Sequence, residues 1–102
     1  MESVPTPSDT PCDALDRAAP LLRVLGNADR LHLLAALADE ELCVSQLAER
    51  LYIQQPTLSQ QLTVLRNNQF VLTRREGKRV FYRLAPRLVP QLALVLALAR
   101  AV

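Results

Sequence analysis

The sequence predicts one mainly helical α+β domain, in which four helices are followed by a β-hairpin and a last helix. Over most of the chain, apolar residues recur at three- and four-residue spacing, which is typical of helices that bury one face. Between residues 70 and 84, apolar and polar residues alternate around a glycine-containing turn, which is typical of a hairpin. With 102 residues, half of them hydrophobic, the chain can form one small core and is too apolar to be disordered.

Residues 1–12 are rich in proline, serine and threonine, so we expect a flexible N-terminal arm there and the folded domain over 13–102. The first helix is expected over residues 13–25, because Gly26 and the following asparagine end it. Pro20 should kink this helix or mark its true start. Its inward residues are predicted to be Leu15, Leu22 and Leu25.

A second helix is expected over residues 29–38. Its apolar face is predicted to comprise Leu31, Leu34, Ala35 and Leu37. His32, the only histidine of the chain, lies on this helix, and we interpret it as a packing or surface residue rather than a metal ligand.

The segment 42–51 reads as a third, short helix. Cys43 stands at the expected N-cap with Gln46 three residues later, as in a capping box. Leu42 and Leu47 have the spacing of a hydrophobic staple. Only three residues then precede the next helix, which is the arrangement of a helix-turn-helix.

A fourth helix is predicted over residues 54–66, with two contrasting faces. Pro56 falls in its first turn, where the missing N–H costs nothing. The buried stripe comprises Leu58, Leu62 and Leu65. The opposite face carries mainly uncharged donors and acceptors: Gln55, Thr57, Ser59, Gln60, Gln61, Thr63 and Arg66. Such groups suit base-pair edges in a major groove, whereas the alternative is a polar surface helix.

Two strands are expected over 70–75 and 79–84, joined by a turn at 76–78. The hairpin tip carries four cations around Glu76, namely Arg74, Arg75, Lys78 and Arg79. A basic hairpin directly after a groove-reading helix is typical of a wing that contacts phosphates or a minor groove. The fold is therefore predicted to be a winged helix-turn-helix, and a merely solvated hairpin is the alternative.

Charge is divided unevenly along the chain, although the net charge is only +2. Residues 1–53 hold nine acids and four bases, whereas residues 54–102 hold eight bases and one acid. This polarity indicates a nucleic-acid footprint on the second half. An enzyme is disfavoured, because no carboxylate pair, activated nucleophile or glycine-rich phosphate loop is found. A winged helix that binds another protein stays open as an alternative function.

The last helix is expected over residues 86–102 and is apolar nearly all round. Its two stripes are Leu88, Leu92, Val95 and Ala99, and Leu94, Leu98, Ala101 and Val102. One stripe can cover the core, so we predict that the other, with the first helix beside it, packs on a second copy to give a two-fold dimer. The stretch is too short to span a bilayer, and no signal peptide is recognised, so a cytoplasmic location and no membrane partner are expected.

The chain resembles the ArsR/SmtB family of bacterial repressors in its order of helices and in three segments. These segments are residues 25–31, residues 55–62 with Leu65 and Arg66, and the wing at 74–82. The resemblance covers roughly residues 14–100. It implies a homodimeric winged-helix repressor that binds a palindromic site in double-stranded DNA, needs no cofactor, and leaves the DNA when an effector is sensed.

Effector sites known in this family match the chain incompletely. The last helix lacks the His and carboxylate ligands that many members use for metals, so no metal site is expected there. Arsenic- and cadmium-type members carry Cys-Val-Cys, where this chain has Cys43-Val44-Ser45. The branch that senses oxidants or reactive sulfur has thiols on the second and last helices, where this chain has Ala36 and a residue near Ala99.

Cys12 and Cys43 are the only thiols. A helix N-terminus favours thiolate at Cys43, and two thiols can form a disulfide or a sulfur-bridged link. We expect a redox or reactive-sulfur switch at Cys12 and Cys43; the alternatives are binding of a metalloid such as As(III), or no sensing role for either thiol.

Single-residue roles follow as expectations for the DNA complex. Base edges are assigned to Thr57, Gln60 and Gln61. Backbone phosphates are assigned to Gln54, Ser59, Thr63 and Arg66. Wing contacts are assigned to Arg75, Lys78 and Arg79, and the expected DNA-binding set is completed by Gln55 and Arg74.

Overall fold

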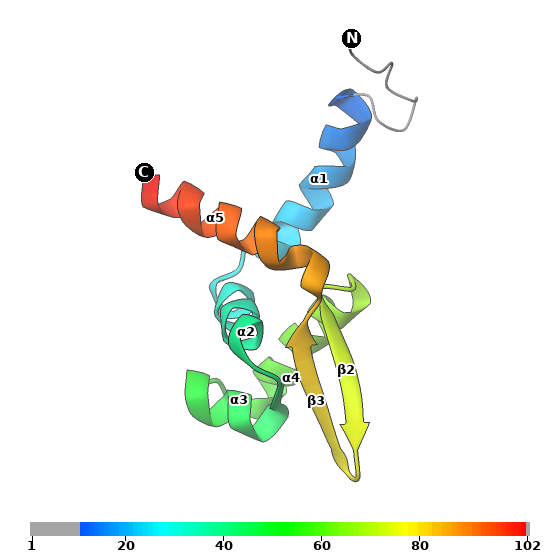
Figure 1. The fold of residues 1–102 in the computed structure, drawn as a ribbon, viewed down its shortest axis with the longest axis vertical. Coiled ribbons are helices and arrows are strands. Elements are labelled where there is room, and N and C mark those ends of the chain that lie inside the picture. Colours follow the sequence, from blue (N-terminus) through cyan, green and yellow to red (C-terminus); the bar gives the residue numbers. More distant parts are fainter. Residues whose placement is uncertain (1–10, 102) are drawn as a thin grey trace.

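Five α-helices and a small antiparallel sheet make up the computed structural model, which describes residues 11–101. In chain order the elements are α1 (Pro11–Leu25), α2 (Ala28–Asp39), β1 (Leu42–Cys43), α3 (Val44–Leu51), α4 (Gln55–Asn67), β2 (Val71–Glu76), β3 (Arg79–Leu84), the 3-10 helix η2 (Pro86–Leu88) and α5 (Val89–Ala101). Helices α2, α3 and α4 gather beside the hairpin, and α1 and α5 extend away from this body (Figure 1). The predicted winged helix-turn-helix is confirmed. Residues 1–10 of the expected arm lie outside the described residues.

The sheet has three strands in the order β1-β3-β2, all antiparallel. Strand β1 was not expected, because two residues carry no periodicity of their own; Cys43 pairs with Phe81 on β3. The turn of the hairpin is tighter than predicted, since β2 extends to Glu76 and β3 begins at Arg79. Gly77 occupies this turn with a φ of 61°, a left-handed conformation that glycine adopts without strain.

The core lies where α2, α3 and α4 meet the base of the hairpin. Its largest fully buried side chains are Leu33, Leu34, Leu42, Leu47, Leu58, Leu62 and Leu65. Each buried leucine of this kind stabilises the fold by about 2 kcal/mol relative to exposure. On α2 the prediction was partly wrong, because Leu33 is buried, Ala35 is exposed and Leu31 is only half-buried. His32 is exposed.

Helix α1 differs from the prediction in its start and in its inward face. It begins at Pro11 and contains Pro20 within its length. Leu15 and Leu22, expected inside, are 69% and 60% exposed, and Val24 is the buried residue. These leucines lack a covering element within the described part of this protomer.

Helix α5 begins at Val89, because η2 takes up the first residues of the expected helix. Its core-facing residue is Leu92, with Leu88 of η2 and Val95 half-buried beside it. Leu94 and Leu98 of the second predicted stripe are 70% and 68% exposed. None of the helices described is long and apolar enough to cross a membrane.

Candidate DNA-binding surface and the Cys43 hollow

The start of α3 is fixed by the cap that the sequence predicts. The backbone N–H of Cys43 donates to Oε1 of Gln46 at 2.9 Å, one half of a capping box in which Cys43 is the N-cap. The staple leucines Leu42 and Leu47 are both buried. Ala48 and Leu51 of the same helix are half-buried. The supporting helix of the helix-turn-helix is therefore held at its entry by polar and apolar contacts together.

The turn between α3 and α4 runs from Tyr52 to Gln54. Tyr52 has a left-handed φ of 57°, which lets the chain reverse direction directly after α3, and its side chain is 93% exposed. Gln54 is the N-cap of α4, and Pro56 lies in its first turn as predicted.

Helix α4 presents a continuous polar face to solvent. Its buried stripe is Leu58, Leu62 and Leu65, as predicted. The exposed residues of the expected DNA-binding set are Gln54, Gln55, Thr57, Ser59, Gln60, Thr63 and Arg66. Within this face, the hydroxyl of Thr63 donates to the backbone oxygen of Ser59 at 2.8 Å. The other hydroxyls and amides stand in solvent as donors and acceptors for a ligand.

Gln61 stands apart from this face. It is half-buried, and its Oε1 accepts a hydrogen bond of 2.7 Å from Nε of Arg30 on α2. One polar atom of the amide is thus already used within the protomer. The sequence could not indicate this contact, because the two residues are 31 positions apart.

The wing presents Arg75, Lys78 and Arg79 as exposed cations. Arg74, grouped with them in the expected DNA-binding set, is also exposed, but its guanidinium is paired with carboxylates of the same protomer. Its Nε and Nη2 donate to Oε1 of Glu41 at 2.9 and 2.6 Å, and its Nη1 donates to Glu76 at 2.6 Å. The guanidinium also lies 5.0 Å from the ring centroid of Phe81. Because two carboxylates compensate its charge, Arg74 braces the wing rather than offering a free cation.

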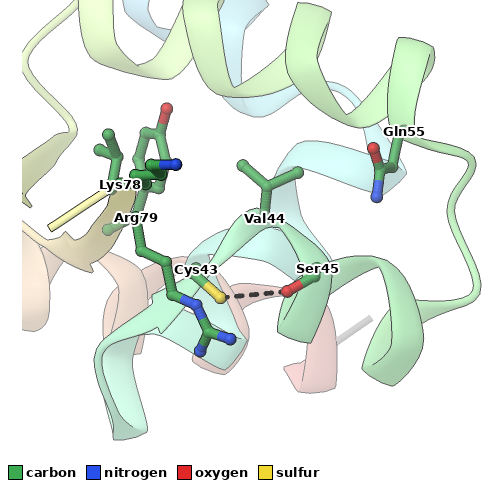
Figure 2. Close-up of a pocket in the computed structure, with 8 residues that line it drawn as sticks. Cys43, Val44, Ser45, Gln55, Lys78 and Arg79 are labelled. Carbon is green, nitrogen blue, oxygen red and sulfur yellow. Dashed lines mark hydrogen bonds between the residues drawn. The ribbon is translucent and has the colours of Figure 1, made fainter. Parts of the chain in front are cut away.

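A hollow of about 380 Å³ lies where α3, α4 and the wing meet. It is lined by Cys43, Val44, Ser45, Gln55, Lys78, Arg79, Val80 and Tyr82. Figure 2 shows the Arg79 side chain running beside Cys43, with Gln55 beyond Val44. Three residues of the expected DNA-binding set, Gln55, Lys78 and Arg79, thus share a hollow with the only thiol of the helix-turn-helix.

Neighbouring groups change the pKa of the Cys43 thiol. Its Sγ lies 3.3 Å from Oγ of Ser45, and the side chain is only 4% exposed. The hydrogen bond with Ser45, the backbone N–H of Gln46 and the nearby charge of Arg79 lower the pKa of Cys43, against the opposing effect of burial. The arrangement favours thiolate at the helix N-terminus.

Cys12 and Cys43 do not meet within the protomer. Cys12 is exposed in the first turn of α1, whereas Cys43 ends β1, and both thiols are free. Figure 1 places the start of α1 and the β1–α3 junction at opposite ends of the molecule. A switch made by direct pairing of the two thiols within this conformation is therefore not possible. Over residues 11–101, no cluster of three or more His, Cys, Asp or Glu side chains could hold a metal ion.

Comparison with known proteins adds independent information. The model of the family described as bacterial regulatory protein, arsR family, matches residues 27–72. The biofilm growth-associated repressor of Agrobacterium fabrum is 47% identical over 81 residues, which cover 76% of this chain and 69% of the relative. The transcriptional activator HlyU of Vibrio cholerae is 44% identical over 69 residues, which cover 68% of this chain and 64% of the relative.

A solved structure extends the likeness to the fold. The homodimeric winged helix-turn-helix DNA-binding domain Mb0332 from Mycobacterium bovis is described as a possible ArsR-family transcriptional regulator. It superposes with a TM-score of 0.79 at 30% sequence identity. The alignment covers 98% of this chain and 91% of the other.

Proposed function

Since this chain belongs to the ArsR family of DNA-binding transcriptional regulators, we propose that it acts in the cytoplasm as a homodimeric repressor of a palindromic operator. The regulators of this family are not enzymes. Repression rather than activation is part of the proposal, because similar proteins include both a repressor and an activator.

The observation that carries the proposal is the exposed polar face of α4 beside the exposed cations of the wing. Gln55, Thr57 and Gln60 are exposed and offer donors and acceptors of the kind that bind base edges in a major groove. Arg75, Lys78 and Arg79 supply the positive charge that phosphates attract. In this proposal α4 recognises the DNA sequence, and the wing adds affinity for the phosphates.

A second observation favours DNA over a protein partner. Protein-binding surfaces centre on exposed aromatic or aliphatic anchors, and among the described residues α4 exposes no large hydrophobic side chain. Tyr52, in the turn before α4, is the nearest exposed aromatic residue in the sequence. The polar and basic character of the surface fits a nucleic acid.

The proposed dimer rests on α1 and α5. Both helices expose leucines that this protomer leaves uncovered, namely Leu15, Leu21, Leu22, Leu94, Leu96 and Leu98. A two-fold arrangement buries such residues against their equivalents on a second copy. It also presents two copies of α4 to successive major grooves, about one helical turn apart.

The proposed signal for release is an oxidant or a reactive sulfur species acting on the thiols. Cys43 supports this part, because its pKa is lowered and it shares a hollow with Gln55 and Arg79. A disulfide with Cys12 would form as an oxidant accepts two electrons from the two thiols and both protons are released. Given the separation described above, that bond requires rearrangement of α1 or a link across the dimer.

Fluorescence anisotropy on operator DNA tests the proposal with the reduced chain, then with mild peroxide or polysulfide. Tight binding that is lost on treatment and restored by a thiol supports a thiol switch, and Cys12→Ser and Cys43→Ser show which thiols it needs. Binding that is unchanged by either oxidant but lost with arsenite assigns the signal to a metalloid instead. An absence of sequence preference in the reduced protein contradicts the repressor itself.

A further inference from the structure

The side chain of Arg30 connects three helices. Arg30 lies in the first turn of α2, and its Nε donates to Oε1 of Gln61 on α4 at 2.7 Å. Its Nη1 donates to the backbone oxygens of Val24 at 3.1 Å and Arg23 at 3.3 Å, both in the last turn of α1. One guanidinium thus spans the distance from the end of α1 to the middle of α4.

The α1 end of this connection has a clear physical basis. The last carbonyls of a helix have no partner within the helix, and they form its negative pole. The guanidinium of Arg30 donates hydrogen bonds to the carbonyls of Val24 and Arg23, and it also places a positive charge at this negative pole. Arg30 is itself held in place, because its backbone N–H donates to Oδ1 of Asn27, the N-cap of α2.

The α4 end of the connection restrains the helix that carries the polar face. Gln61 lies on α4 between Gln60, which is exposed, and Leu62, which is buried. A guanidinium is planar and its donors have fixed directions, so the carbonyl oxygens of α1 and the amide of Gln61 must keep matching positions. A lysine could not impose this geometry, because its ammonium is a point charge on a flexible stem.

We propose that Arg30 is a positioning residue that couples the recognition helix α4 to the dimerisation helix α1 through Gln61. Gln61 then serves DNA recognition by holding α4 in place and not by contacting a base. This inference rests on the proposed function, in which α1 packs at the two-fold axis and α4 enters the groove. A shift of α1 between subunits is passed to the DNA-reading face through a single side chain.

The first test needs no DNA. In NMR spectra of the reduced full-length chain, the Arg30 Nε–H signal is expected to be protected from exchange with water. Gln61→Ala should speed that exchange on the order of tenfold or more, because the acceptor is lost, whereas Gln61→Glu keeps the acceptor and the protection. The backbone amide signals of α4 should move in Arg30→Met and stay in place in Arg23→Met, which removes an equal charge from the end of α1. An exchange rate of the Arg30 Nε–H that is unchanged in Gln61→Ala contradicts the coupling.

The second test uses operator and random duplexes. Gln61→Glu and Gln60→Glu add the same charge at neighbouring positions of α4. We expect Gln61→Glu to retain most of the preference for operator and Gln60→Glu to lose it, because only Gln60 faces the DNA. Arg30→Met and Gln61→Ala should each reduce the preference on the order of tenfold, and the double variant should be no worse than either.

Each outcome of these tests either supports or contradicts the proposed coupling. Equal losses for Gln61→Glu and Gln60→Glu, or additive losses in the double variant, would show that Gln61 acts on the DNA directly and would overturn the inference. If Arg30→Met does not fold, the two glutamate variants and the exchange rate still decide. A wild-type protein without any preference for operator contradicts the proposed function alone, since the exchange measurement judges the coupling separately.

Discussion

Arg74 on β2 donates two hydrogen bonds to Oε1 of Glu41, the residue just before β1. The contact joins the outer strand of the wing to the segment that leads into α3, across 33 positions of sequence. Hydrogen bonding from Arg74, and to a smaller extent its charge, also lower the pKa of Glu41. This brace separates the four exposed cations at the tip of the wing into Arg74, which is paired with carboxylates, and three that form no salt bridge within residues 11–101.

The brace leads to a prediction about salt dependence. Arg79→Ala should lower the slope of log affinity against log salt by about one per protomer, because an exposed cation that meets a phosphate is lost. Arg74→Ala should lower that slope by less, since Glu41 and Glu76 already compensate its charge. Anisotropy titrations from low to moderate salt measure both slopes. Equal changes in the two variants would show that Arg74 leaves its carboxylates to bind DNA.

Direct readout by α4 predicts a loss confined to the operator. Gln60→Ala should weaken binding to operator by about 1–3 kcal/mol and leave binding to random duplex unchanged. The reason is that an exposed glutamine can bond adenine through both of its amide groups, whereas phosphate contacts are indifferent to sequence. Competition titrations with the two duplexes make the comparison. An equal loss of affinity for both duplexes would show that Gln60 contacts the DNA backbone rather than a base.

The exposed leucines of α5 predict the assembly state. Leu98→Asp should convert the dimer to monomer at micromolar concentration, because a carboxylate would be buried in an apolar contact. Leu72→Asp is the matched control, since Leu72 is also exposed but lies on the wing. Sedimentation velocity distinguishes the two species. A dimer that tolerates Leu98→Asp would place the two-fold contact elsewhere.

The environment of Cys43 predicts a pH profile. A lowered pKa means that more thiolate is present at any given pH, so the alkylation rate should reach its midpoint below that of an ordinary thiol. Ser45→Ala should move this midpoint upward, because the hydrogen bond from Ser45 makes the largest contribution to the shift. Alkylation rates are measured in the Cys12→Ser variant, so that Cys43 is the only thiol that reacts. A midpoint that Ser45→Ala leaves unchanged would contradict the assigned cause.

Local pattern was sufficient to predict the helix pair, the hairpin and the buried stripe of α4. Leu58, Leu62 and Leu65 are buried as expected, since helical periodicity is a property of neighbouring residues. Two of the three leucines that the sequence assigned to the inside of α1, Leu15 and Leu22, are exposed, and Leu25 packs against the core. A hydrophobic pattern does not say whether the same chain or a second copy covers the apolar face.

Contacts between distant residues could not be predicted from the sequence. The pairing of β1 with β3, the bond from Arg30 to Gln61 and the brace from Arg74 to Glu41 all join separate elements. Each changes the role of a residue that residue type alone had assigned to DNA or to a helix. Residue type therefore predicted a DNA-binding surface, and the tertiary contacts show which of its side chains are already hydrogen-bonded within the protomer.

The affinity of the reduced full-length protein for its operator, set against a random duplex of equal length at the same salt concentration, tests the central claim most directly. A homodimeric repressor that reads bases through α4 should bind operator on the order of a thousandfold more tightly or better. A ratio near one, with affinity that falls steeply with salt, would mean that α4 and the wing hold DNA only by its charge.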